Sequence, residues 1–194
     1  MKLAIVDVGC GNIGSVSIAF ERLGVEMITT ADPRAIASAD RVVLPGVGAA
    51  GYAMRRIDEL GLRGPIKALK QPVLGICLGM QLLFERSEEE GAECLGIIPG
   101  QVRRLEPTRE RPVPHMGWSK LSLYGSVPGF SAGDYVYFAH SYACDPGPHV
   151  LASAEYGREI PAVVARDNFI GAQFHPERSG PAGSRFLESF VSGS

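Results

Sequence analysis

Residues 72–85, PVLGICLGMQLLFE, form the most specific local pattern in this chain of 194 residues. An apolar run leads to Cys77, which Gly75 and Gly79 flank at a spacing of two, and a helix-like stretch follows. This GxCxG pattern predicts a sharp strand-to-helix turn that lifts the cysteine clear of a sheet. At a helix N-terminus the dipole favours thiolate over thiol, and the N–H of Leu78 can bind a developing oxyanion. The alternative is a buried cysteine between two glycines that serve only packing.

The same succession of strand, turn and helix recurs through the first half of the chain. Apolar runs with β-branched residues alternate with stretches of helical spacing, which favours a parallel sheet covered by helices. The expected strand and helix pairs are 2–8 with 13–23, 25–30 with 33–40, 41–44 with 52–60, and 72–76 with 78–86.

After about Cys94 the pattern changes to strand-like pieces separated by Pro and Gly, which we expect to be antiparallel strands and hairpins added to the sheet. The segment 106–118 has no clear period and is expected to be an ordered loop, and a helix closes the chain. The expected strands are 136–143, 150–156, 161–166 and 169–174, and the apolar face of the last helix is Phe186, Leu187, Phe190 and Val191. The fold class is therefore α/β: one domain, 1–194, with a mostly parallel central sheet, helices on both faces and antiparallel strands in the C-terminal half.

The composition excludes several function classes. Lys and Arg number 19 against 21 Asp and Glu, a net charge of −2, so no positive field favours nucleic acid or an anionic membrane. No apolar stretch approaches the ~20 residues of a membrane helix, and we expect a cytoplasmic protein. The four cysteines form no CxxC pair, which argues against disulfides and a zinc site, and Cys10, Cys94 and Cys144 are expected to be small, semi-buried side chains.

A base for Cys77 is found in GAQFHPERSG, residues 171–180. A thiolate nucleophile needs an imidazole to hold its proton, and that imidazole needs an acceptor to fix its tautomer. His175 and Glu177 can fill these two roles at the end of one strand. A metal site is not expected, because one Cys, one His and one Glu leave no matching ligand cluster.

Two glycine-rich turns complete the candidate chemistry. In RVVLPGVGAAG, residues 41–51, the backbone around Gly46 and Val47 can aim N–H groups at the carboxyl edge of the sheet, as a second half of an oxyanion hole; the alternative is a simple tight turn. Residues 9–14, GCGNIG, have GxGxxG spacing, which suggests a dinucleotide-binding oxidoreductase with Asp32 as the ribose acid. That hypothesis leaves Cys77 and the His-Pro-Glu triplet unexplained.

The GxCxGxQ pattern followed by His-Pro-Glu resembles the class I glutamine amidotransferases, whose sheet is flavodoxin-like, and the resemblance extends over essentially the whole chain. Within them the motifs resemble the glutaminase subunits of imidazole glycerol phosphate synthases of histidine biosynthesis, because GNIGSV and PHMGW separate these from the anthranilate, GMP and carbamoyl phosphate synthase glutaminases. The quoted stretches are VDVGCGNIGSVSIAFERLG, LPGVGAAGYAM, GICLGMQLLFERSEE, PHMGWS, YFAHSYAC and FHPERSG.

The resemblance implies that Cys77 attacks the side-chain amide of glutamine, that His175 protonates the departing ammonia and then activates water, and that Glu177 orients His175. It implies no dinucleotide role for the first glycine turn and no cofactor. It also implies supporting roles for further residues: Gly46, Val47 and Leu78 around the oxyanion, and Gln81, Glu89, Ser141 and Tyr142 on the glutamine.

The implied partner is a separate (β/α)8 barrel cyclase that forms a heterodimer with this chain and consumes the ammonia. Its products would be imidazole glycerol phosphate and an aminoimidazole carboxamide ribotide. The residues expected at that interface are Asn12, His115, Trp118 and Ser119. The family usually has Asn after the PHMGW tryptophan, where this chain has Ser119. A third hypothesis, a non-catalytic subunit with a decayed site, conflicts with the complete Cys, His and Glu set.

Overall fold

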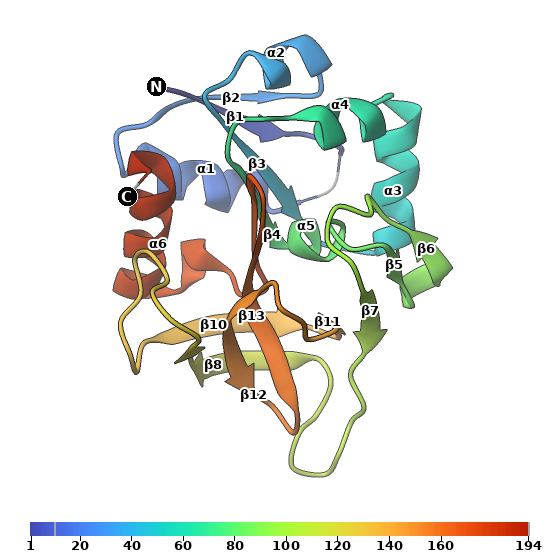
Figure 1. Cartoon of the computed structure of the whole chain (residues 1–194), viewed down its shortest axis with the longest axis vertical. Helices are drawn as coiled ribbons and strands as arrows, with labels where there is room; N and C mark the ends of the chain where they lie inside the picture. Colours follow the sequence, from blue (N-terminus) through green and yellow to red (C-terminus); the bar gives the residue numbers. More distant parts are fainter. Residues whose placement is uncertain (10, 194) are drawn as a thin grey trace.

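The computed structural model describes residues 1–9 and 11–193, and its main element is an eight-stranded mixed sheet (Figure 1). In spatial order the strands are β2 (Glu26–Thr30), β1 (Lys2–Val6), β3 (Arg41–Gly46), β4 (Val73–Cys77), β14 (Phe169–Ala172), β13 (Glu159–Arg166), β12 (Val150–Glu155) and β9 (Ser122–Leu123). Neighbouring strands are parallel from β2 to β14 and antiparallel from β14 to β9. The predicted fold class is confirmed.

Helices cover both faces of the sheet because side chains alternate along its strands. Leu3 and Ile5 pack with α1 (Ile13–Glu21) and α6 (Gly180–Ser192), whereas Ala4 and Val6 pack with the helices of the opposite face. Those helices are α2 (Pro33–Ala37), α3 (Ala50–Glu59) and α4 (Arg63–Ala68). Figure 1 shows α1 and α6 on one side of the sheet and α3 on the other. None of the helices described is long and apolar enough to cross a membrane.

The helix expected over 78–86 is much shorter than predicted. Helix α5 comprises only Leu78–Gln81. Beyond it the carbonyl oxygens of Leu82, Leu83 and Phe84 accept hydrogen bonds from backbone N–H groups in 95–98. These three side chains are fully buried, so the stretch has the apolar content of a helix although its backbone is anchored by a distant segment.

Two small sheets replace the single strand expected over 136–143. Strand β10 (Tyr135–His140) pairs with β8 (His115–Lys120), so the expectation of a loop through residue 118 is also wrong. Strand β11 (Tyr142–Cys144) belongs instead to a sheet with β7 (Gln101–Arg104), β5 (Arg86–Ser87) and β6 (Ala92–Glu93). The chain leaves β10 at Ser141, whose carbonyl accepts from Leu105 N at 2.9 Å.

Cys94 and Cys144 are free and more deeply buried than expected, with 5% and 0% of their surface exposed. The prediction for Cys10 falls outside the described residues.

Candidate active site

Cys77 is the turning point between β4 and α5. Its backbone has φ 53° and ψ −109°, a conformation that L-residues rarely adopt and that costs about 1–3 kcal/mol. The flanking glycines allow it: a Cβ on Gly75 would lie 2.6 Å from Gly79 O, and a Cβ on Gly46 would lie 2.9 Å from Gly79 N. The predicted sharp strand-to-helix turn is therefore present.

His175 and Glu177 lie at the same edge of the sheet, just beyond β14. His175 Nδ1 is 2.8 Å from Glu177 Oε1, and the Glu177 side chain is only 1% exposed. Ser179 Oγ donates to His175 O at 2.7 Å and accepts from Tyr137 N at 3.0 Å, which ties the histidine backbone to β10. With Nδ1 facing the carboxylate, Nε2 is the ring nitrogen left for Cys77.

The electrostatics of the imidazole depend on both neighbours. Burial by itself lowers the pKa of His175, but hydrogen bonds with Cys77 and Glu177, together with the negative charges of these two groups, raise this pKa to about 10. A histidine in this setting holds its proton firmly whenever the cysteine is negatively charged. His175 is thus hydrogen-bonded to Glu177 on one side and interacts electrostatically with Cys77 on the other.

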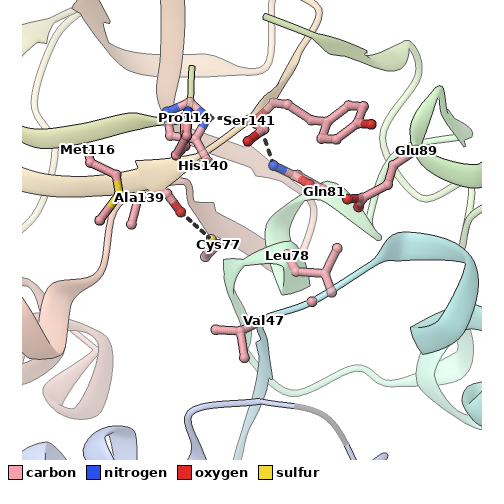
Figure 2. Close-up of a pocket in the computed structure, with 12 residues that line it drawn as sticks. Val47, Cys77, Leu78, Gln81, Glu89, Pro114, Met116, Ala139, His140 and Ser141 are labelled. Carbon is pink, nitrogen blue, oxygen red and sulfur yellow. Dashed lines mark hydrogen bonds between the residues drawn. The ribbon is translucent and has the colours of Figure 1, made fainter. Parts of the chain in front are cut away.

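A cavity of about 220 Å³ opens beside the Cys77 sulfur (Figure 2). Figure 2 shows the sulfur directed toward Ala139, with Gln81 and Glu89 on the side away from Met116. The cavity is lined by Val47, Gly48, Cys77, Leu78, Gln81, Glu89, Pro114, Met116, Ala139, His140, Ser141 and Tyr142. Gly46 is not a lining residue, although it is paired with Cys77 in the register of β3 and β4.

Gln81 closes one end of the cavity through its amide group. Its Nε2 donates to Tyr142 O at 2.8 Å and to Gln173 Oε1 at 3.0 Å. Gln173 is fully buried and directs its own Nε2 to Cys77 Sγ at 3.8 Å. Gln173 was not among the residues predicted from the sequence, although its spacing of two from His175 in an extended segment places both on one face.

Glu89 also serves the scaffold. Its Oε2 accepts a hydrogen bond of 2.8 Å from Ala50 N, at the start of α3. Burial raises the pKa of Glu89, as does the charge of Glu90, while the Ala50 hydrogen bond lowers it. The carboxylate therefore links the first turn of α3 to the cavity wall.

A chain of buried hydrogen bonds extends from β8 to the cavity wall. Ser119 Oγ lies 3.0 Å from His115 Nε2, His115 Nδ1 lies 3.0 Å from His140 Nε2, and His140 Nδ1 lies 2.7 Å from Tyr142 O. Burial lowers the pKa of His115 to about 4 and that of His140 to about 3. Both rings are neutral near pH 7, and because Tyr142 O can only accept, every donor in the chain points toward that carbonyl.

Three of the residues expected at a partner interface lie on β8, and the pleat of this strand places them on opposite faces. His115 is 2% exposed and points inward, so its side chain cannot reach a partner's surface, and Ser119 turns toward it. Trp118 points outward with 54% of its surface exposed, so the chain's only tryptophan is not a core residue. Met116, 63% exposed, lies on the same outer face. Asn12 precedes α1 and is half-buried.

The first glycine turn lies beside the β3 turn. Gly9 and Gly11 have φ of +77° and +143°, and a Cβ on Gly11 would lie 3.8 Å from Pro45 O. Asp32, the acid of the dinucleotide hypothesis, caps α2 by accepting from Arg34 N at 2.9 Å. Among residues 1–9 and 11–193 no three His, Cys, Asp or Glu side chains are grouped so that they could hold a metal.

The sequence matches the family model of class I glutamine amidotransferases over residues 4–193. The chain belongs to the class I glutamine amidotransferase family. This amidotransferase is 46% identical over 192 residues to the imidazole glycerol phosphate synthase subunit HisH of Idiomarina loihiensis, covering 98% of this chain and 97% of the relative. It is 43% identical over 199 residues to subunit HisH 1 of Vibrio vulnificus, with the same coverage.

Solved structures support the fold. A crystal structure of a glutamine amidotransferase superimposes with a TM-score of 0.77 at 19% identity, covering 97% of each chain. The structure of PurLQS from Thermotoga maritima gives a TM-score of 0.71 at 18% identity, covering 99% of this amidotransferase and 98% of that chain. At these identities the likeness establishes the architecture alone.

Proposed function

We propose that this chain is the glutaminase subunit of an imidazole glycerol phosphate synthase, acting in cytoplasmic histidine biosynthesis as one domain, 1–194. The observation that carries the assignment is the identity of 43–46% with HisH subunits over 98% of the chain. The subunit hydrolyses glutamine to glutamate and ammonia. The contacts among Cys77, His175 and Glu177 supply the chemistry for this step.

The reaction begins at the sulfur. The Cys77 thiolate attacks the side-chain carbonyl carbon of glutamine, and backbone N–H groups of Val47 and Leu78 bind the oxyanion. The His175 imidazolium then gives its proton to the departing nitrogen. The carbon–nitrogen bond breaks, ammonia leaves, and a glutamyl thioester remains on Cys77. Neutral His175 next takes a proton from water, whose hydroxide attacks the thioester to release glutamate and restore the thiolate. Glu177 holds Nδ1–H throughout and fixes the ring.

The pocket walls orient the amino-acid end of the substrate. Both N–H donors of the Gln81 amide are engaged by protein acceptors, so its Oε1 is the atom available to the substrate ammonium group. Glu89 adds negative charge to the cavity lining, and Ser141 and Tyr142 line the cavity beside Gln81, whose Nε2 donates to Tyr142 O. Such an arrangement favours a small cationic amine next to the cleavable amide.

Removal of the nucleophile separates this proposal from a structural role for Cys77. In the complex with the cyclase, Cys77→Ala is expected to lose glutamine-dependent synthesis and to keep synthesis from added ammonium salt. Cys94→Ala is the matched control, because Cys94 is buried outside the cavity, and it should keep both activities. Loss of both activities in Cys77→Ala would make Cys77 structural. Wild-type complex that binds NADH tightly and releases no glutamate would favour the oxidoreductase instead.

The partner in this proposal is a (β/α)8 barrel cyclase that forms a heterodimer with the glutaminase. Ammonia that escaped into neutral water would mostly be protonated, so a shielded path to the cyclase is useful. Glycine-flanked peptide units turn over at small steric cost, so the Gly46–Val47 unit can present its carbonyl when idle and its N–H when active. One missing oxyanion donor costs ~10²–10³ in rate.

We therefore expect the isolated subunit to hydrolyse glutamine slowly, and the cyclase with its nucleotide ligand to raise kcat by at least ~10² with a smaller effect on KM. Trp118→Ala should weaken assembly and activation. Tyr124→Ala, which removes another exposed aromatic ring from the end of β9, is the control. Full glutaminase activity of the isolated subunit would refute control by the partner. Unchanged assembly and activation of Trp118→Ala would refute a role of Trp118 at the interface.

A further inference from the structure

A second cavity, of about 410 Å³, lies between the β7–β8 connection and the β12–β13 hairpin, and it shares no lining residue with the glutamine pocket. Four of its nine lining residues are arginines, and only one is acidic. The lining residues are Arg103, Arg104, Leu105, Glu106, Thr108, Arg111, Tyr156, Gly157 and Arg158.

The charges of this cavity are not balanced by the protein. Arg103 is neutralised by Asp145 at 2.8 Å and Glu88 at 3.3 Å. The guanidinium groups of the other three lining arginines form no ion pair with any residue that the structure describes. With Glu106, Asp145 and Glu88 set against the four arginines, the cavity and its ion-pair partners retain a net charge of about +1, which favours an anionic ligand such as a phosphate monoester.

Local packing fixes the loop that carries Arg111. Tyr156 OH donates to Pro112 O at 2.7 Å and ties the loop to the hairpin, and Arg111 N donates to Thr108 Oγ1 at 3.1 Å. Gly157 makes room for the Arg111 side chain, because a Cβ at this position would lie 2.9 Å from Arg111 Cδ.

The Arg158 guanidinium has one nitrogen without an acceptor in the described chain. Nη2 of Arg158 is buried and has no hydrogen-bond partner within residues 1–9 and 11–193. A buried donor without an acceptor is costly.

We propose that this cavity is a binding site for a phosphate monoester, with Arg104, Arg111 and Arg158 on the phosphate oxygens. Guanidinium groups match phosphate geometry and remain charged at any physiological pH. The cavity is larger than a single phosphate group needs, so it accommodates the organic part of the ester against Leu105 and Tyr156. The proposal does not depend on the glutaminase assignment.

The site adjoins the back of the glutamine pocket. The Tyr156 ring stacks on His115 with centroids 3.8 Å apart and 18° between the planes. His115 is hydrogen-bonded to His140, which lines the pocket that contains Cys77. A ligand bound to the arginines therefore lies behind His115 and His140. The contact of Tyr156 with His115 and the contact of His115 with His140 separate it from the catalytic cavity.

Calorimetric titration of the full chain with ribose 5-phosphate tests the proposal. We expect saturable binding of one equivalent, no binding of ribose, and weaker binding of succinate, a dianion without phosphate. Arg111→Gln and Arg158→Gln should each lower the affinity at least ~10-fold, the loss expected for one charge-assisted hydrogen bond. Arg109→Gln, in the same loop but outside the lining, should leave the affinity unchanged.

Three results would overturn the site: no saturable binding of ribose 5-phosphate, equal or tighter binding of succinate, or equal affinities of the wild type and the two cavity variants. Arg104→Gln guards against misfolding as an explanation, because Arg104 is an exposed side chain whose replacement disturbs no packing, and it should lower the affinity as well. Thermal unfolding of each variant confirms that the fold is retained.

Discussion

Replacement of Glu177 by Gln isolates the contribution of the orienting carboxylate. The change keeps the size of the side chain and an acceptor for His175 Nδ1–H, now 2.8 Å from Glu177 Oε1, but it removes the negative charge. The pKa of His175 is about 10, against 6.5 for an ordinary imidazole. This difference corresponds to roughly 5 kcal/mol in favour of the imidazolium, a stabilisation that Cys77 and Glu177 share.

If Glu177 supplies about half of that stabilisation, its charge is worth roughly 2–3 kcal/mol to the protonated imidazole. The imidazolium forms or persists in every proton transfer of the cycle, so kcat should fall roughly 30- to 150-fold. Misorientation of the ring can raise the loss to ~10⁴-fold. The KM for glutamine should change little, because Glu177 does not line the substrate cavity.

The assay is glutamate release by the assembled complex at saturating glutamine. Glu188→Gln, an exposed position on α6, is the matched control and should retain wild-type kcat. Glu177 Oε2 has no hydrogen-bond partner in the described part of the chain, so the new amide N–H is left unsatisfied and some loss of thermal stability is expected. A folded Glu177→Gln protein that keeps kcat within tenfold of wild type would refute the reasoning.

Two further predictions use the other titratable side chains. An electrophilic glutamine analogue such as diazo-oxo-norleucine should label Cys77 alone by peptide mass mapping, because burial raises the pKa of the Cys94 thiol to about 11; label on Cys94 at a comparable rate would contradict this selectivity. The free energy of unfolding should fall as the pH drops from 6.5 toward 4. Burial lowers the pKa of His115 and His140 in the folded chain, so only the unfolded chain binds protons there, at up to about 1.4 kcal/mol per pH unit for each histidine. Urea titrations at several pH values measure this slope, which His140→Asn should reduce; an unchanged slope would rule out His140 as a source.

The parallel half of the fold could be predicted because its signals are local. Strands β1, β3 and β4 contain apolar runs, β2 is rich in β-branched residues, and each of the four is followed by a turn and a stretch of helical period. The small sheets had no such signal. β5 and β6 have two residues each, too short for any period, and the sheet that they form also needs β7 and β11 from later in the chain.

The candidate site shows the same division between local and distant information. Cys77, His175 and Glu177 carry residue types that chemistry requires, in short motifs, and their contact could be expected from parallel strands that end at one edge of the sheet. Gln173 and His140 contribute through partners supplied by other strands, so their roles emerge only in three dimensions. The inward orientation of His115 follows from the pleat of β8, a strand that the prolines around it had concealed.

The glycines around the nucleophile explain why so short a helix can hold a strained residue. A Cβ on Gly79 would overlap the carbonyl oxygen of Leu44, so only glycine lets α5 begin directly against β3. Leu78, the first residue of α5, lines the cavity, and Cys77 joins β4 to α5 directly before it with a φ of 53°. The strain at the cysteine is thus offset by packing of the two elements beside it, and the glycine spacing that predicted the fold also sets the position of the sulfur.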